Sequence, residues 1–273
     1  MSQENGFTAL EVSTDVLKAL NHMGIHTPTQ IQKETIPPMM AGNDIIGIAP
    51  TGTGKTIAFG IPMLEYISLT ETRVQELVLA PTRELAMQIV AELEELARFI
   101  PQIRIATLYG GQPMTRQINQ LKRRPQIVVA TPGRLLDMVG RGDVRLDQVH
   151  TMVIDEADEM LKMGFVKDVT RIIELTPPNR QLVMFSATTN NDVLTISWKF
   201  QHTPVEITVE ATAENRPQIK QYIMVVPREG KMGALQYLLD SDEYDRIMIF
   251  VNTKFMTQRV ADRLQKQGYK AEA

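Results

Sequence analysis

Eight residues between two apolar segments have the composition of a phosphate-binding loop. The stretch APTGTGKT runs from Ala49 to Thr56, after the apolar run DIIGI and before the amphipathic IAFGIPMLEYI. Glycines between a strand and a helix let backbone N–H groups surround phosphate oxygens, so we predict a nucleotide site here. Lys55 would neutralise the phosphates, and the Thr56 hydroxyl would bind Mg²⁺. The predicted site comprises Ala49, where this pattern usually begins with glycine, and Thr51, Gly52, Thr53, Gly54, Lys55 and Thr56.

A second group of charged residues ends another apolar run. The stretch VIDEAD covers Val153 to Asp158, and carboxylates are costly beside a buried strand unless a cation meets them. We expect Asp155 to hold Mg²⁺, directly or through water, and Glu156 to polarise the water that attacks the terminal phosphate. An acidic cap on the following helix would explain the same letters. Because VIDEAD lies in the same predicted sheet as the phosphate loop, nucleotide hydrolysis is favoured over the acidic cap as its explanation.

Three further stretches follow predicted strands and should share one edge of the sheet. They are PTREL, GG and TPGR. Thr82 and Thr131 can cap the next helices and Pro132 suits a first helical turn, so free N–H groups there can bind anions. Each alone is an ordinary cap or turn. Together they predict a track for successive phosphates of one nucleic-acid strand, formed by Pro81, Thr82, Arg83, Gly110, Gly111, Thr131, Pro132, Gly133 and Arg134.

The elements that would position these residues alternate along the chain. Short runs rich in Val, Ile and Leu, such as ELVLA, QIVVA and QLVMFSA, are each followed by a stretch with helical periodicity. Buried runs that alternate with helices predict an α/β fold, a parallel sheet with helices on both faces.

A polar stretch without clear periodicity, EATAENRPQIKQ, divides the chain. We predict a first domain over 1–208, a linker over 209–218 and a partial second domain over 219–273. The second part should contain strands YIMVVP (222–227) and RIMIFV (246–251) and two helices, GKMGALQYLLD and KFMTQRVADRLQKQG. A fragment of about 50 residues can hardly close such a core alone.

Composition narrows the class of protein. The 273 residues carry a net charge of −3, so any nucleic-acid contact must be local. There is no cysteine, and the four histidines lack metal-ligand spacing, which argues against zinc and disulfide sites. No apolar stretch approaches about 18 residues and the start lacks a signal-peptide pattern, so we expect a cytoplasmic monomer with no membrane partner.

The ordered motifs resemble those of DEAD-box ATP-dependent RNA helicases of bacterial type. DEAD stands at Asp155 to Asp158, and the set continues with PTRELA, GG, TPGR and SAT, the last at Ser186 to Thr188. GIHTPTQIQ, from Gly24 to Gln32, with an isolated Phe7 upstream, resembles the adenine-recognition segment of that family. The resemblance implies RecA-like P-loop NTPase lobes that bind ATP, Mg²⁺ and single-stranded or short duplex RNA through its backbone.

The same resemblance assigns further residues. Gln32 should recognise adenine, because an amide can pair with the N6 donor and N7 acceptor that guanine lacks, so ATP is preferred over GTP. Phe7 would stack on the base, or, as an exposed residue before an amphipathic helix, it would act as a hydrophobic staple. Ser186 and Thr188 would bind Asp158 and couple ATP to strand separation, unless they only cap a helix. The preference for RNA over DNA comes from the resemblance alone.

The sequence departs from the family's motif set at one point that bears on activity. IMIFVNT, from Ile247 to Thr253, resembles the first motif of the family's second lobe, but nothing matches the later ARGxD or HRxGRxGR. Those segments supply RNA contacts and arginine fingers, which are worth about 10³ to 10⁵ in rate. We expect an RNA-stimulated ATPase and helicase in truncated form, with weak binding, slow hydrolysis and no unwinding. The alternatives are a non-catalytic ATP- and RNA-binding lobe and a DNA translocase, against which DEAD, PTREL and the Gln32 segment argue.

Overall fold

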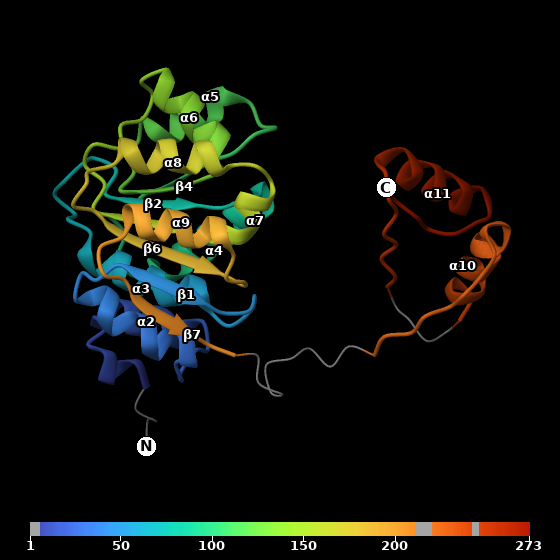
Figure 1. Cartoon of the computed structure of the whole chain (residues 1–273), viewed down its shortest axis with the longest axis horizontal. Coiled ribbons are helices and arrows are strands. Elements are labelled where there is room, and N and C mark those ends of the chain that lie inside the picture. The colour runs from blue at the N-terminus through green and yellow to red at the C-terminus, as the bar shows by residue number, and fades with distance from the viewer. Residues whose placement is uncertain (1–5, 211–219, 242–245) are drawn as a thin grey trace. The chain divides into compact units, whose positions relative to one another are not determined.

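The computed structural model describes residues 6–210, 220–241 and 246–273. Within the chain, contacts define two units, Met1–Arg216 and Pro217–Ala273. Most of the linker predicted at 209–218 lies outside the described residues, so these domain limits stay predictions. Figure 1 shows the following elements, in chain order: η1 (Gly6–Leu10), α1 (Thr14–His22), α2 (Gln30–Met40), β1 (Ile45–Ile48), α3 (Lys55–Tyr66), β2 (Glu76–Leu79), α4 (Arg83–Leu96), β3 (Ile105–Leu108), α5 (Met114–Leu121), β4 (Ile127–Ala130), α6 (Pro132–Gly140), β5 (Thr151–Ile154), α7 (Ala157–Lys162), α8 (Val166–Leu175), β6 (Gln181–Ser186), α9 (Asn191–Phe200), β7 (Val205–Thr208), η2 (Arg228–Gly230), α10 (Lys231–Leu239) and α11 (Lys254–Lys266).

The first unit is built on a seven-stranded sheet. Its strand order is β3-β4-β2-β5-β6-β1-β7, and every pairing is parallel. The α/β fold with a parallel sheet, predicted from alternating apolar runs and helical stretches, is confirmed. In a parallel sheet all strands end at one edge, so the loops that follow β1 to β6 lie along the same edge.

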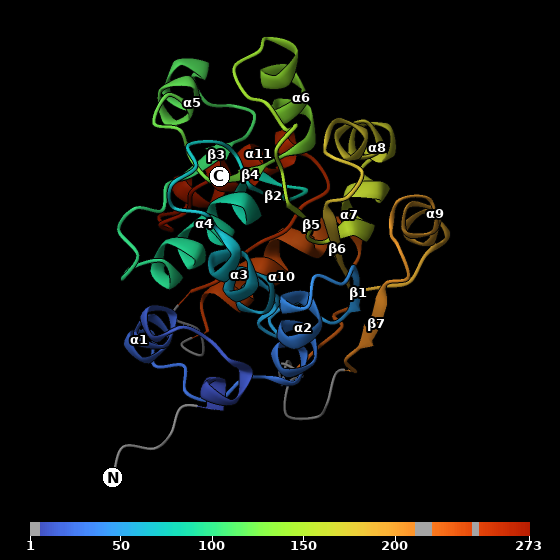
Figure 2. The ribbon, with the colours of Figure 1, turned by 90° about the vertical axis from the view of Figure 1, so that its left-hand side faces the viewer.

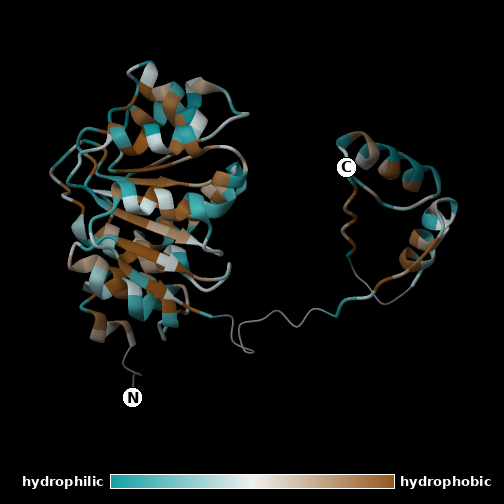
Figure 3. Cartoon of the chain, in the orientation of Figure 1, coloured by the Kyte–Doolittle hydropathy of each residue, from teal (hydrophilic) through white to brown (hydrophobic). Residues whose placement is uncertain are grey.

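Both faces of the sheet are covered by helices, because alternate residues of each strand point to opposite sides. Leu77 and Leu79 of β2 belong to one buried apolar cluster, whereas Val78 belongs to the other. Helices α1 to α4 contribute to the cluster that contains Val78, and α5 to α9 pack on the other face. Figure 2 shows α2, α3 and α4 on one side of the strands and α7, α8 and α9 on the other. In Figure 3 the hydrophobic colour follows the strands.

The second unit differs from the expectation in one respect. Helices α10 and α11 form where they were predicted, but the described residues of 222–227 and 246–251 form no strand. Their side chains are largely exposed, among them Ile223, Val225 and Phe250. A strand exists only through hydrogen bonds to a neighbour, and no backbone hydrogen bond joins these two segments in the part that the structure describes.

No described helix combines the length and apolar character that crossing a bilayer requires.

Candidate functional site

The phosphate loop connects the end of β1 to the start of α3. Gly52 and Gly54 have φ values of 83° and 89°, a left-handed conformation that is open to glycine and strained for other residues. Gly54 occupies the N-cap position of α3, so the free N–H groups of the first helical turn face the loop. The Ala49 N–H donates to Ser186 O at 3.0 Å, which places the loop beside the end of β6.

Two residues of the GIHTPTQIQ segment hold this loop from α2. The Thr29 hydroxyl donates to Thr53 O at 2.9 Å, and the Gln32 Nε2 amide donates to Gly54 O at 3.1 Å. Gln32 Oε1 accepts the Thr29 N–H at 2.9 Å, which completes a capping box at the start of α2. Both ends of the Gln32 amide are therefore engaged by the protein, and Gln32 is almost fully buried. Its contact with adenine stays a prediction.

Phe7 lies inside the protein. Its side chain is fully buried in the apolar cluster formed with α1 to α4, whereas the staple alternative assumed an exposed ring. The 3-10 turn η1 positions the ring, and the Gly6 N–H anchors this turn by donating to His26 O at 2.9 Å. The stacking of Phe7 on a base stays a prediction, and the ring face that it would use is covered in this structure.

The lysine of the phosphate loop lies next to the first carboxylate of DEAD. Lys55 Nζ is 4.0 Å from Asp155 Oδ1 and donates to Ala49 O at 3.3 Å. Both side chains are at least 94 % buried. Burial raises the pKa of Asp155 to about 6, although the charge of Lys55 and the Glu156 N–H oppose this shift. The two motifs thus meet at one buried site.

Glu156 has an unusual backbone. Its φ is 50° and its ψ is 48°, a left-handed conformation that costs a residue with a Cβ about 1–3 kcal/mol. The residue occupies the N-cap position of α7, yet its side chain makes no capping hydrogen bond, which disfavours the acidic-cap explanation. Instead its N–H donates to Asp155 Oδ1 at 2.9 Å. The side chain is half-buried.

The oxygens at this site fit Mg²⁺. Thr56 offers a hydroxyl and Asp155 a carboxylate, and both residues are buried. Nowhere in the described ranges do three or more His, Cys, Asp or Glu side chains gather into a metal cluster. A site with one carboxylate and one hydroxyl suits Mg²⁺, which usually keeps several waters and completes its shell with phosphate oxygens.

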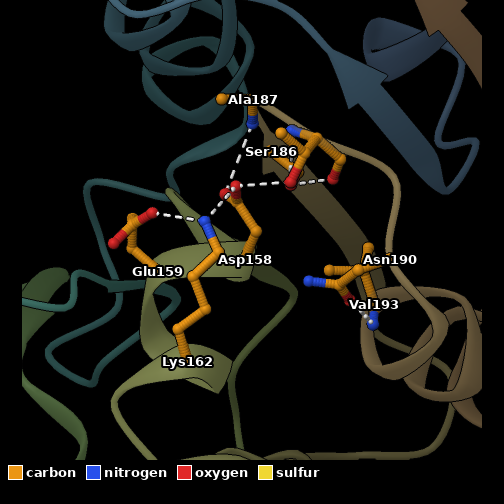
Figure 4. A network of polar contacts seen from close by, with 8 residues as sticks. Asp158, Glu159, Lys162, Ser186, Ala187, Asn190 and Val193 are labelled. Carbon is orange, nitrogen blue, oxygen red and sulfur yellow. Dashed lines mark hydrogen bonds and ion pairs between the residues drawn. The ribbon is translucent and has the colours of Figure 1, made fainter.

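The last residue of DEAD is joined to the SAT segment. The Thr188 hydroxyl donates to Asp158 Oδ2 at 2.8 Å, and the Ala187 N–H donates to Asp158 Oδ1 at 3.3 Å. The Ser186 hydroxyl donates to Thr188 O at 2.6 Å and so helps to orient Thr188 toward Asp158. Figure 4 shows these contacts together with Lys162, whose Nζ is 3.4 Å from Asp158. Asn190 caps α9, so Ser186 and Thr188 are not its caps.

The surroundings of Asp158 stabilise its charged form. Burial raises the pKa of Asp158, but the hydrogen bond from Thr188, the nearby Ser186 hydroxyl, the Ala187 N–H and the charge of Lys162 together outweigh burial and lower it. Asp158 is therefore a carboxylate that is fully partnered by the end of β6 and by α7.

The three predicted anion sites follow strands that are neighbours in the sheet, since β4 lies between β3 and β2. Backbone bonds continue past the strand ends, from Thr131 N to Leu108 O and from Ala80 N to Ala130 O. Thr82 caps α4 by accepting the Leu85 N–H at 3.2 Å, whereas Thr131 stands at the N-cap of α6 without a side-chain capping bond.

Exposure along this edge suits a ligand that approaches from solvent. Gly110, Gly111 and Gly133 are exposed and Arg83 is exposed, whereas Pro81 and Pro132 are buried beneath them. Pro132 begins α6. Arg134 is half-buried, and its buried Nη1 atom has no hydrogen-bond partner among the described residues.

Sequence reasoning missed several residues that support the site. The stretch TQIQ, from Thr29 to Gln32, has the spacing of a capping box, so that signal was readable. Lys162 stands four residues after Asp158, the spacing of a helical ion pair. Tyr109 and Gln117 adjoin the GG loop, and no local pattern marks them.

Comparisons with known proteins agree with this geometry. Residues 29–196 match the DEAD/DEAH box helicase family. The chain is 42% identical over 266 residues to the DEAD-box ATP-dependent RNA helicase CshA of Geobacillus kaustophilus, covering 97% of this chain and 57% of that protein. It is 41% identical over 267 residues to the ATP-dependent RNA helicase DeaD of Mycobacterium tuberculosis, covering 98% and 47%.

A solved structure is also similar. The crystal structure of a DEAD box protein from the hyperthermophile Methanococcus jannaschii aligns with a TM-score of 0.71 and 34% identity, over 97% of this chain and 71% of that one. The present chain thus spans about half the length of the curated relatives that it matches.

Proposed function

Because the chain belongs to the DEAD/DEAH box helicase family, we propose that its first unit is the ATP-binding lobe of an ATP-dependent RNA helicase, the activity named for the relatives CshA and DeaD. The observation that carries the proposal is the approach of Lys55 to Asp155, 100 positions later in the chain, to 4.0 Å within a buried site. Two separate motifs converge there as nucleotide hydrolysis requires.

Each residue of the site has a proposed task toward ATP. The N–H groups at the start of α3 and the Lys55 ammonium bind the phosphates. Thr56 and Asp155 would hold Mg²⁺, which supplies charge neutralisation at the phosphates when bound. Glu156, fixed by its strained backbone beside Asp155, orients the attacking water and accepts its proton. Gln32 and Thr29 keep the loop in place and Gln32 favours adenine.

The RNA strand would lie across the loops after β2, β4 and β3. Helix N-termini and exposed glycines at these loops offer N–H groups to phosphates, and Arg83 and Arg134 add positive charge. Contacts of this kind do not depend on base sequence. The hydrogen bonds from Thr188 and Ala187 to Asp158 support a role for the SAT segment in linking the ATP site to RNA.

Nucleotide binding tests this proposal. We expect a fluorescent ATP analogue with Mg²⁺ to bind the chain, and ATP to displace it at lower concentration than GTP. Lys55→Ala should abolish binding, whereas Arg145→Ala, at an exposed residue that belongs to none of the site motifs, should leave it unchanged. Equal competition by GTP would overturn the role of Gln32, and unaltered binding by Lys55→Ala would overturn the site itself.

Turnover separates a catalytic lobe from a non-catalytic one. We propose that the 273-residue polypeptide hydrolyses ATP slowly, because no segment of it matches the family's arginine-finger motifs. Its rate with and without single-stranded RNA should then be close to that of Glu156→Gln. An RNA-dependent rise that Glu156→Gln abolishes would contradict slow turnover and would support a complete catalytic site in these residues.

A further inference from the structure

Tyr109 follows edge strand β3 directly and lies beneath the predicted phosphate track. Its ring is 95% buried, and the Arg83 guanidinium carbon lies 5.4 Å from the ring centroid. A guanidinium within about 6 Å of an aromatic face is attracted by the ring quadrupole. Arg83 begins α4, the helix that follows β2, so this contact joins the segments after β2 and β3, two strands that are not neighbours in the sheet.

The backbone of Tyr109 is fixed from α5. The Tyr109 N–H donates to Gln117 Oε1 at 3.2 Å, and Gln117 Nε2 donates to Tyr109 O at 2.9 Å. One buried amide thus satisfies both backbone groups of a residue at the sheet edge, where no further strand can do so. Gln120, about one turn further along α5, accepts the N–H of Thr107 on β3 at 3.0 Å. Gln117 therefore fixes the backbone that carries the Tyr109 ring, and the ring's hydroxyl donates to Met87 Sδ at 3.4 Å.

The Arg83 guanidinium also borders the GG turn. Gly111 has a φ of 81°, and a Cβ on it would lie 4.0 Å from Arg83 Nη1. No described acidic side chain forms an ion pair with Arg83. The ring below and the glycine beside it thus hold an exposed cation that none of the described carboxylates pairs with.

From this arrangement we propose that Tyr109 is a positioning residue for RNA and that Gln117 supports it. The ring holds the Arg83 guanidinium against the Gly110–Gly111 turn, so that one phosphate of the RNA strand is bound by the arginine and by the turn together. This inference rests on the proposed function, and it assigns to two residues outside the family motifs a part in forming the RNA site.

The test measures the affinity of the chain for a fluorescein-labelled single-stranded oligouridylate by anisotropy. Tyr109→Leu should weaken binding about two- to fivefold, the range that corresponds to a cation–π contact at a partly exposed site. Tyr109→Phe keeps the ring and should bind as the unsubstituted chain does. In an Arg83→Gln background, Tyr109→Leu should have no further effect, because the ring acts through the arginine.

Two matched substitutions on α5 test whether Gln117 supports Tyr109. Gln117→Met and Gln120→Met each remove one amide from the edge of β3, but only Gln117 holds Tyr109. We expect weaker RNA binding by Gln117→Met alone. Additive effects of the Arg83 and Tyr109 substitutions, or equal losses in Tyr109→Phe and Tyr109→Leu, would overturn the positioning role while RNA binding itself persists. Absence of RNA binding by the unsubstituted chain would refute the proposed function.

Discussion

Replacing Glu76 with leucine should stabilise the protein at neutral pH. Glu76 begins β2, is fully buried, and has no hydrogen-bond partner for either carboxyl oxygen among the described residues. It pairs in register with Ile127 and Thr151 in the middle of the sheet. A buried polar group without a partner costs about 1–3 kcal/mol. Glu76→Leu removes this cost in a site of suitable size.

The gain should depend on pH. Burial raises the pKa of Glu76 well above its ordinary value, and the Thr151 side chain on β5 offsets only part of this shift, so the folded state keeps a proton that the unfolded state releases. Above the ordinary pKa of glutamate, the unfolded state binds fewer protons, and the free energy of unfolding therefore falls as pH rises, until the raised folded pKa is passed. The slope reaches about 1.4 kcal/mol per pH unit. Glu76→Leu has no carboxyl group that can lose a proton here. Its gain in free energy of unfolding over the unsubstituted chain should therefore grow with pH.

Urea unfolding followed by circular dichroism at several pH values between 4 and 8 measures this effect. Glu94→Leu, an exposed glutamate on α4, is the control that changes the same atoms at the surface. We expect the midpoint difference between Glu76→Leu and the unsubstituted chain to widen from acid to neutral pH, and that of Glu94→Leu to stay constant. A Glu76→Leu variant that is less stable at every pH, or a difference independent of pH, would refute this reasoning.

Three further substitutions test the site. Gly54→Ala should abolish ATP binding in equilibrium titration, because a Cβ there would lie 2.4 Å from the Gln32 amide at a φ of 89°; retained affinity would contradict the loop geometry. Thr188→Val should lower the free energy of unfolding in urea by about 1.5–3 kcal/mol at neutral pH. This loss should shrink as pH falls below the ordinary pKa of aspartate, because the lowered pKa of Asp158 stabilises the fold only where the carboxylate is charged. A loss that is constant with pH would argue against the link between Thr188 and Asp158. Thr82→Ala should cost about 1 kcal/mol in thermal unfolding through the lost cap on α4 and should weaken RNA binding, whereas Thr82→Ser should do neither.

The strands and the motif loops could be predicted because their signals are local. Strands β1, β2, β4, β5 and β6 are mostly apolar runs buried on both faces, whereas the edge strands β3 and β7 are partly exposed. Each motif follows one of the strands. The strand order could not be predicted in the same way, because it depends on which crossovers pack together. That order makes the loops after β3, β4 and β2 adjacent, and sequence reasoning had placed them only on a common edge.

Other features depend on partners that are distant in sequence. The Gln32 amide bonds to Gly54, 22 residues away, and no local pattern shows that its donors are already engaged. The staple alternative required an exposed Phe7, yet η1 turns the ring inward. The apolar runs at 222–227 and 246–251 have strand composition, but composition supplies no hydrogen-bonding neighbour.

Amide hydrogen exchange with mass spectrometry tests the central claim most directly. The claim is that ATP and RNA bind along the carboxyl edge of the sheet. With ATP and Mg²⁺, we expect slower exchange in 49–56, and with single-stranded RNA, slower exchange in 81–85, 109–113 and 131–135. The opposite edge, 72–75 and 142–148, should exchange at an unchanged rate with either ligand. Protection confined to that opposite edge, or RNA protection that spares all three loops, would contradict it.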